Sequence, residues 1–451
     1  MSRNCSIGID IATENARVVL LSEEHHVLFR QSHQLSPVQP GANGALVQDP
    51  NSWVNAVTKL LESALIWARD SKMNPSGAVI SATSGTFVIV DELGVPIMPA
   101  IMYNDRRGNT PLQRAASALS SMKLSTSSLR FAHTPEFVIS TLLSIDIDEV
   151  PTDWSHALKT GVELSERNWS AVALTSAEAL NLALPQVVSP GTLIGEFDAS
   201  SWGLAPIPFF AGMTDGCTGQ ISAGGAKLGN CVTTLGTTLV LKNAAKTPIS
   251  GSGFYSHLAT DSLYLVGAAS NLGGDSLHKH VTKLDKLESA AKERGLSTVI
   301  SYPLRRSGER FPISNSTIEP FWSAKPIDEV DEYLSILEGV AFAERLSYEI
   351  LNRAGADISG DFLSVGGGTK SALWNEIRCN VLNRELRVIP ESGSDIGAAI
   401  LAQAAKSEQG LHRTLTTFEV RDYQKFEPIP KLSTRYNERY LEFKELVREY
   451  L

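Results

Sequence analysis

Two segments of this chain share one pattern, a hairpin of two apolar strands joined by a short polar turn. Residues 7–20 read IGIDIATENARVVL, and residues 231–241 read CVTTLGTTLVL. In each half, further strands and helices follow the hairpin, which predicts a mixed α/β fold. Because the pattern occurs twice, we expect two similar α/β domains that face each other across a cleft.

The length of the chain supports this division. At roughly 100–200 residues per domain, 451 residues predict two or three domains. We expect an N-terminal domain at 1–205, a C-terminal domain at 206–408 and a C-terminal helical extension at 409–451. Hydrophobic residues make up 43% of the chain, which is typical of proteins that bury large cores.

Charge and cysteine usage argue against several classes of protein. The net charge is -9 and no strong basic block occurs, so we expect no nucleic-acid partner. The four cysteines form no Cys-x-x-Cys pair, which argues against a zinc site and a disulfide framework. No segment approaches the ~18 apolar residues of a membrane span, and we see no signal peptide. We therefore expect a cytoplasmic protein without a membrane partner, and a homodimer stays open.

Apolar periodicity predicts two long helices. Residues 53–68 carry apolar side chains at helical spacing, and residues 328–354 form a longer amphipathic pattern. Residues 109–200 are rich in Ser and Ala and have weak periodicity, and we expect them to be mostly helical and irregular.

Asp10 ends the first apolar strand, directly before the polar turn. A carboxylate at a strand end can hold a hydrated Mg²⁺ while N–H groups of the turn face a phosphate. An exposed Asp that only opens a hairpin is the alternative, and this residue alone does not decide between them.

Asp215 lies in AGMTDG, where an apolar strand passes into a predicted helix. A carboxylate at this place can accept the proton of a substrate hydroxyl, as a general base does in phosphoryl transfer. Asp also caps helix N-termini well, so capping is the alternative. The position of the residue leaves both interpretations open.

Two glycine-containing turns can approach a phosphate. In TTLGTT at 233–238, Gly236 permits a tight turn and the threonines offer donors, although a Thr-rich hairpin is the alternative. GGGTKS at 366–371 ends a strand and begins a helix, whose N-terminus can bind an anion. It has neither P-loop nor G-x-G-x-x-G spacing, so a purely structural turn also stays open.

Polar residues also follow strands of the first half. TSGT at 83–86 and YND at 103–105 can match the hydroxyls of a sugar, or they can serve as ordinary turns. HKH at 278–280 has no third ligand nearby in the sequence, so we do not expect a metal there.

The order of these motifs resembles the FGGY family of carbohydrate kinases, over most of the chain. The resemblance rests on both hairpins, YND, TDG at 214–216, GAASNLGG at 267–274, GERFP at 308–312, LEGVAFAER at 337–345 and GGGTK at 366–370. Within the family, the D-ribulose kinase branch is the most similar, through TSGT, TSSL at 126–129 and YPLRRSGERFPI at 302–313.

The resemblance implies two actin-like (ribonuclease H-like) domains with an interdomain cleft. It also implies ATP and Mg²⁺ as cofactors, and transfer of the γ-phosphate to a terminal hydroxyl of a ketose, with D-ribulose expected. D-xylulose, another polyol or a heptulose are alternative sugars. A non-catalytic, actin-like, ATP-binding regulatory protein is the alternative from another class.

The resemblance also implies a role for particular residues. It implies Asp215 as the catalytic base, which also contacts the sugar, and Asp10 as the residue near the metal and the sugar. The other implied substrate-binding residues are Glu14, Asn15, Ala16, Arg17 and Asp105. The implied nucleotide-binding residues are Thr13, Gly236, Thr237, Gly274, Gly367 and Ser371.

The first hairpin, the position of Ser371 and one short segment depart from the family pattern. Ala12 replaces a glycine of the first hairpin, which narrows the freedom of that turn. Glu14 replaces a small hydroxyl residue and adds negative charge where phosphate or sugar should lie. Ser371 stands where Asn is common, and the segment between TSSL and DWSHALK is short, which leaves the sugar open.

Overall fold

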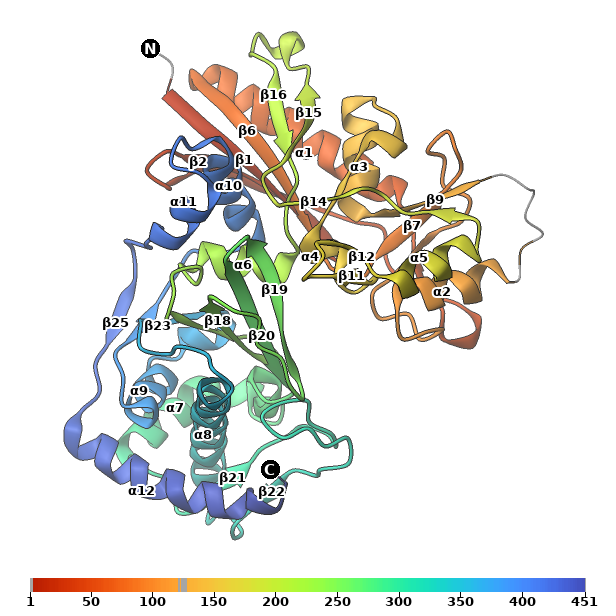
Figure 1. Ribbon diagram of the computed structural model, residues 1–451. Helices are drawn as coiled ribbons and strands as arrows, with labels where there is room; N and C mark the ends of the chain where they lie inside the picture. Colours follow the sequence, from red (N-terminus) through yellow and green to blue (C-terminus); the bar gives the residue numbers. More distant parts are fainter. Residues whose placement is uncertain (1–2, 121, 123–127, 451) are drawn as a thin grey trace. The chain divides into compact units, whose positions relative to one another are not determined.

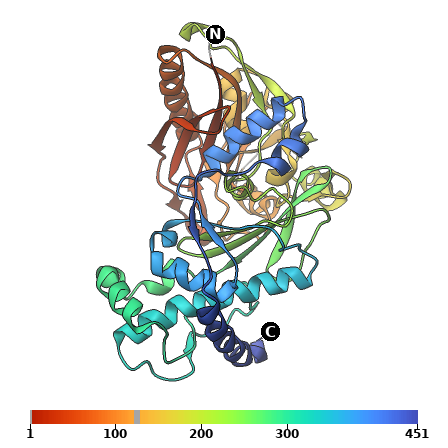
Figure 2. The same cartoon turned by 90° about the vertical axis from the view of Figure 1, so that its left-hand side faces the viewer.

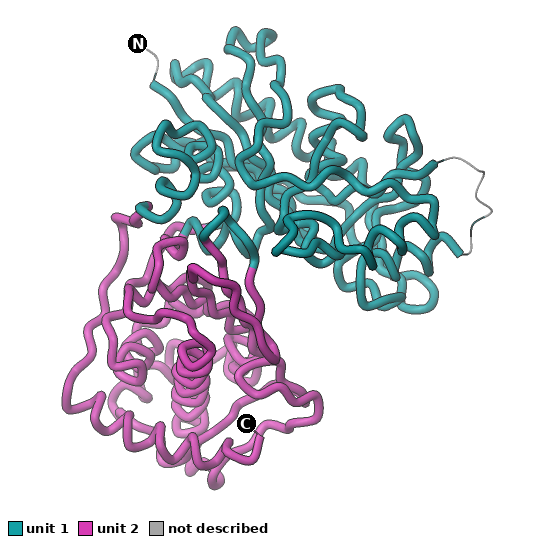
Figure 3. The backbone as a smooth tube through the Cα atoms, viewed as in Figure 1, with its two compact units in different colours: residues 1–222, 257–262, 393–417 teal, residues 223–256, 263–392, 418–451 magenta. Residues whose placement is uncertain are grey.

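The computed structural model describes residues 3–120, 122 and 128–450, so part of the TSSL motif, residues 126 and 127, lies outside them. The chain forms two compact units (Figure 3). Unit 1 comprises residues 1–222, 257–262 and 393–417, and unit 2 comprises residues 223–256, 263–392 and 418–451. The domain limits expected from the sequence stay a prediction, because compact units and family domains are different divisions of a chain.

Unit 1 contains two six-stranded sheets. The first consists, in spatial order, of β15 Leu193–Phe197, β16 Ile207–Phe210, β6 Met73–Ala82, β1 Arg3–Ile11, β2 Asn15–Ser22 and β3 Val27–Gln34. The second consists of β13 Leu182–Ala183, β9 Leu129–His133, β7 Phe87–Val90, β8 Ala100–Ile101, β5 Leu46–Gln48 and β4 Gln39–Pro40. Two small pairs add β10 Thr152–Asp153 with β14 Val187–Val188, and β11 Val162–Glu163 with β12 Asn168–Trp169.

The helices of unit 1 are mostly short. The α-helices are α1 Asn51–Asp70, α2 Pro111–Leu119, α3 Thr134–Leu143, α4 Trp154–Ala157, α5 Ala171–Glu178, α6 Asp215–Ser222, α10 Ser394–Lys406 and α11 Leu411–Thr417. The 3₁₀ turns are η1 Ala42–Gly44, η2 Ile147–Glu149 and η3 Ser200–Trp202. The helix expected at 53–68 is confirmed by α1.

Helices cover both faces of the first sheet of unit 1 (Figure 1). α1 packs against β2, β3 and β6, and its buried face joins the core of alternate strand residues such as Ile7 and Ile9. α10 lies against β1, β2 and β6 and approaches the intervening position Gly8. The central strands β1, β2 and β6 are therefore largely buried on both faces, which accounts for their apolar sequences.

Residues 109–200 differ from the sequence prediction. Helices α2 to α5 occupy only part of this segment, and the short strands β9 to β15 are distributed among them. The expectation of a mostly helical segment was therefore wrong, whereas its irregular character is confirmed. Strands of two residues, such as β13, are held by pairing with distant strands, so they leave almost no periodic signal in the sequence.

Unit 2 is built around a seven-stranded sheet. Its strands, in spatial order, are β19 Phe254–Thr260, β20 Leu263–Ser270, β18 Leu239–Ala245, β17 Cys231–Leu235, β23 Phe362–Val365, β24 Leu386–Val388 and β25 Gln424–Phe426. A small pair is formed by β21 Ser301–Tyr302 and β22 Phe321–Trp322. The helices are α7 Leu284–Arg294, α8 Glu329–Arg353, α9 Ala372–Leu382 and α12 Pro430–Leu446, with the 3₁₀ turns η4 Gly274–Leu277, η5 Val281–Lys283, η6 Gly367–Lys370 and η7 Arg448–Tyr450.

The helix α8 is the centre of the unit 2 core. It is buried along most of its length, and α9, α7 and α12 pack against it (Figures 1 and 2). On α12, Tyr440 and Phe443 contact the ring of Phe342 in α8 with centroid distances of 6.2 and 5.5 Å. Both helices expected from the sequence here, at 328–354 and near the C-terminus, are confirmed. No helix in the part of the chain that the structure describes is long and apolar enough to cross a membrane.

The two units repeat one topology. In unit 1 the order β3-β2-β1-β6-β16 places an antiparallel meander beside two strands parallel to β1. In unit 2 the order β20-β18-β17-β23-β24 has the same directions. Both hairpins and their repetition, expected from the sequence, are confirmed.

The close contact between β1 and α10 predicts a strong effect of one methyl group. A Cβ on Gly8 would lie 1.8 Å from the carbonyl oxygen of Asp395 and 2.5 Å from the amide of Ala399. Both are backbone atoms that cannot move alone, so we expect Gly8→Ala to lower the free energy of unfolding by roughly 3 kcal/mol. Urea denaturation followed by tryptophan fluorescence measures the change.

Gly195→Ala, in β15 of the same sheet, is the control. Its Cβ would meet the ends of two flexible side chains, Leu143 Cδ1 at 3.0 Å and Ile145 Cδ1 at 3.9 Å. We expect a change within about 1 kcal/mol for this variant. Equal unfolding midpoints for Gly8→Ala and the wild type would contradict the packing of α10 on β1.

Candidate active site

Three parallel strands of unit 1 bring polar residues to one edge of the sheet. Asp10 lies near the end of β1, Thr83 directly follows β6, and Asp215 follows β16. A parallel bridge between Ala82 and Thr214 continues the pairing of β6 beyond the end of β16. The carboxyl ends of adjacent parallel strands are a common place for ligand sites, because the chain leaves a crevice outside this edge of the sheet.

Asp10 is paired with the residue opposite it in the hairpin. Arg17 Nη1 donates to Asp10 Oδ2 at 2.8 Å, and the Arg17 side chain is 40% exposed whereas that of Asp10 is 3% exposed. The second oxygen, Asp10 Oδ1, is buried and has no hydrogen-bond partner among the described residues. A buried carboxylate oxygen without a partner is unusual and marks a place where a ligand can bind.

The surroundings raise the pKa of Asp10 to about 7 from its usual value near 3.8. Burial is the main cause, followed by the negative charge of Asp215, while Arg17 acts in the opposite direction and Asp395 adds a smaller increase. Two carboxylates close to one another repel, so the ionised form of Asp10 is disfavoured. A perturbed acidic group of this kind is typical of functional sites.

The hydrogen bonds of Asp215 decide between the two interpretations left open by the sequence. In an N-cap the side chain accepts the N–H groups two or three residues later. Here the N–H groups of Cys217 and Thr218 donate instead to the carbonyl of Thr214, at 2.9 and 3.0 Å. Asp215 Oδ1 accepts only the adjacent Gly216 N–H, at 2.6 Å. The carboxylate therefore does not cap α6.

The remaining contacts of Asp215 orient it. Thr83 Oγ1 donates to Asp215 Oδ2 at 3.2 Å, and Ser394 Oγ donates to its backbone carbonyl at 3.0 Å. Ser394 begins α10, and the next residue, Asp395, is fully buried and bound by two nitrogens of Arg30 at 2.7 and 2.8 Å. We did not predict Arg30 or Asp395 from the sequence, because their meeting spans 365 positions of the chain.

The first hairpin turn is closed by its own backbone. The N–H of Ala12 donates to the carbonyl of Asn15 at 3.0 Å, and Gln48 Nε2 donates to the carbonyl of Thr13 at 2.9 Å. Ala12 is not among the described residues with a positive φ, so the turn tolerates the replacement of glycine there. Glu14 is exposed at the tip.

Ala16 and Asp105 are placed where their side chains are already engaged. Ala16 is buried in the hydrophobic core, so only its backbone remains for a ligand. Asp105 accepts the N–H of Leu46 at 2.9 Å and the Arg107 Nη2 group at 2.7 Å. Although burial raises the pKa of Asp105, these bonds hold it below its usual value. The structure thus joins Asp10, Arg17, Thr83 and Asp215 into one group and gives Asp105 a separate set of partners.

At the corresponding strand ends of unit 2, turns that contain glycine take the place of the carboxylates. The turn after β17 is held by a bond from the N–H of Gly274 to the carbonyl of Gly236 at 2.8 Å. The N–H of Asp275 donates to the carbonyl of Thr237 at 3.1 Å. A Cβ on Gly273, whose φ is +143°, would lie 2.8 Å from that same carbonyl. The two turns therefore touch through their backbones, which requires glycine at this position.

The glycines after β23 have two different roles. Gly366 has a φ of +101°, and its Cβ would lie 2.6 Å from the carbonyl of Leu235. A Cβ on Gly368 would collide with the Leu235 side chain at 2.5 Å. Gly367 between them faces open space, with no atom within 4 Å of its Cβ position. Packing explains the outer two glycines, whereas Gly367 presents bare backbone to a ligand.

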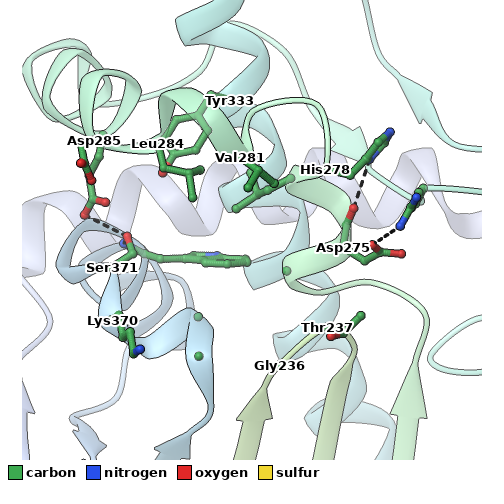
Figure 4. A pocket seen from close by; sticks show the side chains of 17 residues that line it. Gly236, Thr237, Asp275, His278, Val281, Leu284, Asp285, Tyr333, Lys370 and Ser371 are labelled. Carbon is green, nitrogen blue, oxygen red and sulfur yellow. Dashed lines mark hydrogen bonds and ion pairs between the residues drawn. The ribbon is translucent and has the colours of Figure 1, made fainter. Parts of the chain in front are cut away.

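These turns border a cavity of about 640 Å³ in unit 2, shown in Figure 4. Its walls combine glycine backbone, polar side chains and apolar surfaces. In Figure 4, Tyr333, Leu284 and Val281 lie on one side, and Lys370 and Thr237 lie on the other. An apolar slot beside exposed backbone N–H groups fits a flat base with attached phosphates.

Ser371 lies in this cavity at the start of α9. Its Oγ accepts the N–H of Trp374 at 3.1 Å and donates to Glu288 Oε1 at 2.9 Å. Ser371 therefore caps the helix and also lines the cavity. Of the six nucleotide-binding residues implied by the resemblance, Thr13 belongs to unit 1 and does not line this cavity, whereas the other five do, namely Gly236, Thr237, Gly274, Gly367 and Ser371. The apolar walls were missed, because their spacing is that of ordinary core residues.

The residues around Asp10 fit a magnesium ion of the kind that binds with a nucleotide. Mg²⁺ keeps several waters and takes one or two protein carboxylates together with phosphate oxygens. Asp10 Oδ1 offers one such oxygen without a competing hydrogen bond in the described structure. No group of three or more potential metal ligands occurs among the described residues, so such an ion would depend on phosphate and water for its other ligands.

Comparisons with known proteins cover both halves of the chain. Residues 5–142 match the model of the N-terminal domain of the FGGY family of carbohydrate kinases. Residues 231–406 match the model of the C-terminal domain of the same family. The two matches follow the order of the two hairpins.

Relatives extend the similarity to nearly the whole chain. The xylulose kinase of Escherichia coli (strain K12) is 24% identical over 448 residues, covering 90% of this chain and 91% of its own. The gluconokinase of Bacillus subtilis (strain 168) is 22% identical, with 88% and 86% covered. A crystal structure of a "xyloylose kinase" from Brucella ovis matches with a TM-score of 0.86 at 21% identity, covering 99% of both chains.

The raised pKa of Asp10 predicts how stability depends on pH. Because folding raises this pKa, the folded protein binds the proton more tightly than the unfolded chain, and stability falls as pH rises from about 4 to about 7. Asp10→Asn removes this penalty, so we expect the variant to be more stable than the wild type at pH 8, by up to about 4 kcal/mol. At pH 4 the two should be equally stable.

Thermal and urea unfolding across this pH range measure the difference. Asp198→Asn is the control, since Asp198 is exposed and hydrogen bonds from Ser200 lower its pKa. That variant should gain no stability as the pH rises. A constant difference between Asp10→Asn and the wild type from pH 4 to pH 8 would contradict the assigned environment.

Proposed function

We propose a sugar and a catalytic base for this chain, which belongs to the FGGY family of carbohydrate kinases and has the two-domain actin-like fold of that family. The proposed acceptor is D-ribulose, and the proposed general base is Asp215. As a member of the family it is an ATP-dependent sugar kinase. The product would be the sugar 5-phosphate, because the terminal hydroxyl of a ketopentose is the expected nucleophile.

The assignment of Asp215 as the base rests on the burial, the hydrogen bonds and the position of its carboxylate. It is half-buried, it does not cap α6, and it lies at the strand edge beside Asp10. A carboxylate held by Thr83 and by its neighbouring N–H keeps lone pairs for a substrate hydroxyl. This supports proton acceptance, since a carboxylate used as a helix cap would have fewer free lone pairs for the hydroxyl.

In the proposed reaction the O–H bond of the acceptor breaks and its proton passes to Asp215. The oxygen forms a bond to the γ-phosphorus while the bond to ADP breaks. Base catalysis of this kind contributes about 10²–10⁴-fold, and positioning supplies much of the remainder. Asp10 would hold the Mg²⁺, which supplies positive charge toward the phosphates.

The cavity of unit 2 is the proposed nucleotide site. Apolar side chains would enclose the base, and the exposed backbone around Gly236 and Gly367 would approach the phosphates. The proposed roles of Thr237, Gly274 and Ser371 follow from their place in the same walls.

The choice of sugar rests on the loop after β6. Ser84 Oγ is buried without a hydrogen-bond partner in the described structure, and Thr86 Oγ1 accepts the N–H of Tyr103 at 3.1 Å. This TSGT loop, typical of the D-ribulose branch, supports D-ribulose. D-xylulose is the second candidate, because the relative from Escherichia coli is a xylulose kinase.

A panel of acceptors tests the sugar. ADP formation should rise sharply with one ketose, and we expect kcat/KM for D-ribulose to exceed that for D-xylulose at least about tenfold. A heptulose, glycerol and gluconate complete the panel. A preference for D-xylulose would overturn the D-ribulose assignment, and ATP consumption that no sugar stimulates would favour the non-catalytic alternative.

Replacement of Asp215 tests the base. Asp215→Asn keeps the shape of the side chain but cannot accept the proton, so we expect kcat to fall about 10²–10⁴-fold. The affinity for ATP should stay within about twofold, because the proposed nucleotide site belongs to unit 2. Asp198→Asn, on the exposed surface of unit 1, should behave as the wild type. Sugar phosphorylation by Asp215→Asn at the wild-type rate would refute the assignment.

A further inference from the structure

A buried polar cluster lies in unit 1 behind the strand edge that carries Asp215. It consists of Asp153 at the end of β10 and of Ser155 and His156 in α4. Their relative exposures are 3%, 0% and 0%. No ligand can reach these side chains directly, so their effect on chemistry must pass through the residues they bind.

Asp153 is the centre of the cluster. Its Oδ1 accepts the N–H of Ser155 at 2.8 Å, the hydroxyl of Ser155 at 2.6 Å and the N–H of His156 at 3.1 Å. Its Oδ2 is bonded to Nδ1 of His156. Both carboxylate oxygens are therefore engaged, and the short helix α4 is fixed by its first residues.

The cluster reaches the base through Ser155. The hydroxyl of Ser155 donates to Asp153 and accepts the backbone N–H of Thr214 at 2.9 Å. Thr214 immediately precedes Asp215, and its carbonyl holds the first turn of α6. A single hydroxyl thus binds the backbone at the point where the chain turns from the sheet edge into the helix.

The cluster also reaches the second residue that orients the base. Nε2 of His156 lies 3.3 Å from the carbonyl oxygen of Ala82. The next residue, Thr83, donates its hydroxyl to Asp215 Oδ2. The two segments that meet at the Asp215 carboxylate are therefore tied to one buried group, 59 and 74 positions away in the chain.

The partners of His156 require it to donate from both nitrogens. Nδ1 faces a carboxylate and Nε2 faces a carbonyl oxygen, and only the protonated imidazole has two N–H groups. Burial lowers the pKa of His156, but the charge and hydrogen bond of Asp153 outweigh it and raise this pKa overall. Such a doubly bonded ion pair is rigid, which suits a group that holds two segments in register.

We propose that Asp153, Ser155 and His156 form a positioning cluster that sets the direction of the Asp215 carboxylate through Thr214 and Ala82. The inference rests on the proposed role of Asp215 as the base. It adds residues that never touch the sugar, the nucleotide or a metal. Misplacement of a reacting group by about 1 Å can slow a reaction by about 10²-fold, so a positioning group has a measurable effect on kcat.

Ser155→Ala is the decisive variant. It removes the acceptor of the Thr214 N–H and one donor to Asp153, and it leaves the backbone N–H bonds of Ser155 and His156 to Asp153 in place. We expect kcat to fall about 10- to 100-fold, while KM for ATP stays within about twofold and the melting temperature changes by only a few degrees. Steady-state kinetics with ATP and the preferred sugar measures both constants.

Ser140→Ala is the matched control. Its hydroxyl donates to the carbonyl of Ile145 at 2.8 Å in the same unit, away from the strand edge. The same chemical change there should leave kcat within about twofold. Asp153→Asn is the second variant, because its amide oxygen still accepts from Ser155 while the ion pair with His156 is lost. We expect its kcat to lie between those of the wild type and Ser155→Ala.

The outcomes separate this inference from the proposed function. A folded Ser155→Ala variant with wild-type kcat overturns the inference, even if Asp215→Asn is inactive. A parallel loss of kcat and ATP affinity in Ser155→Ala also overturns it, since that result indicates a general structural role. If Ser155→Ala does not fold, Asp153→Asn decides by the same constants, and if neither folds the cluster serves folding and the inference fails. An active Asp215→Asn refutes the base assignment instead.

Discussion

The parallel pairing of β1, β6 and β16 is the constraint on which the rest of unit 1 depends. It brings the ends of three distant segments to one edge, so Asp10 and Asp215 meet although 205 positions separate them. Their repulsion and the burial of Asp10 raise the pKa of Asp10, and Arg17 offsets only part of this effect. Such an arrangement lowers the stability of the folded protein, and enzymes retain it where a charged group takes part in binding or catalysis.

The same topology supports a different chemistry in unit 2. The edge that carries carboxylates in unit 1 carries glycine turns in unit 2, and close backbone contacts at Gly273 and Gly366 require these turns. Backbone N–H groups suit phosphates, whereas a carboxylate suits a hydroxyl proton. A kinase needs both functions, and in the proposed division of roles the repeated fold supplies one in each unit. The hydrogen bonds of the cluster around Asp153 reach the residue before Asp215, so we infer that support for the carboxylate extends well beyond the strand edge.

Local signals in the sequence were sufficient for the hairpins, the long helices and the order of the motifs. They were insufficient wherever the structure or role of a residue depends on residues that are distant in the sequence. Asp215 could not be separated from a helix cap, because the answer depends on where the N–H groups of Cys217 and Thr218 point. Asp105 is bound by Leu46, 59 positions away, which no local pattern reveals. The short strands within 109–200 were missed for the same reason, since tertiary pairing holds them.

We propose that unit 1 binds and deprotonates the acceptor hydroxyl and that unit 2 binds the nucleotide. Calorimetric titration with ADP of the wild type, Asp215→Asn and Gly367→Val tests this division most directly. A valine at Gly367 would fill the open space beside the glycine turn. We expect Asp215→Asn to bind ADP like the wild type and Gly367→Val to lose at least about tenfold in affinity, or roughly 1.4 kcal/mol. Unchanged binding by Gly367→Val, together with weakened binding by Asp215→Asn, would contradict it.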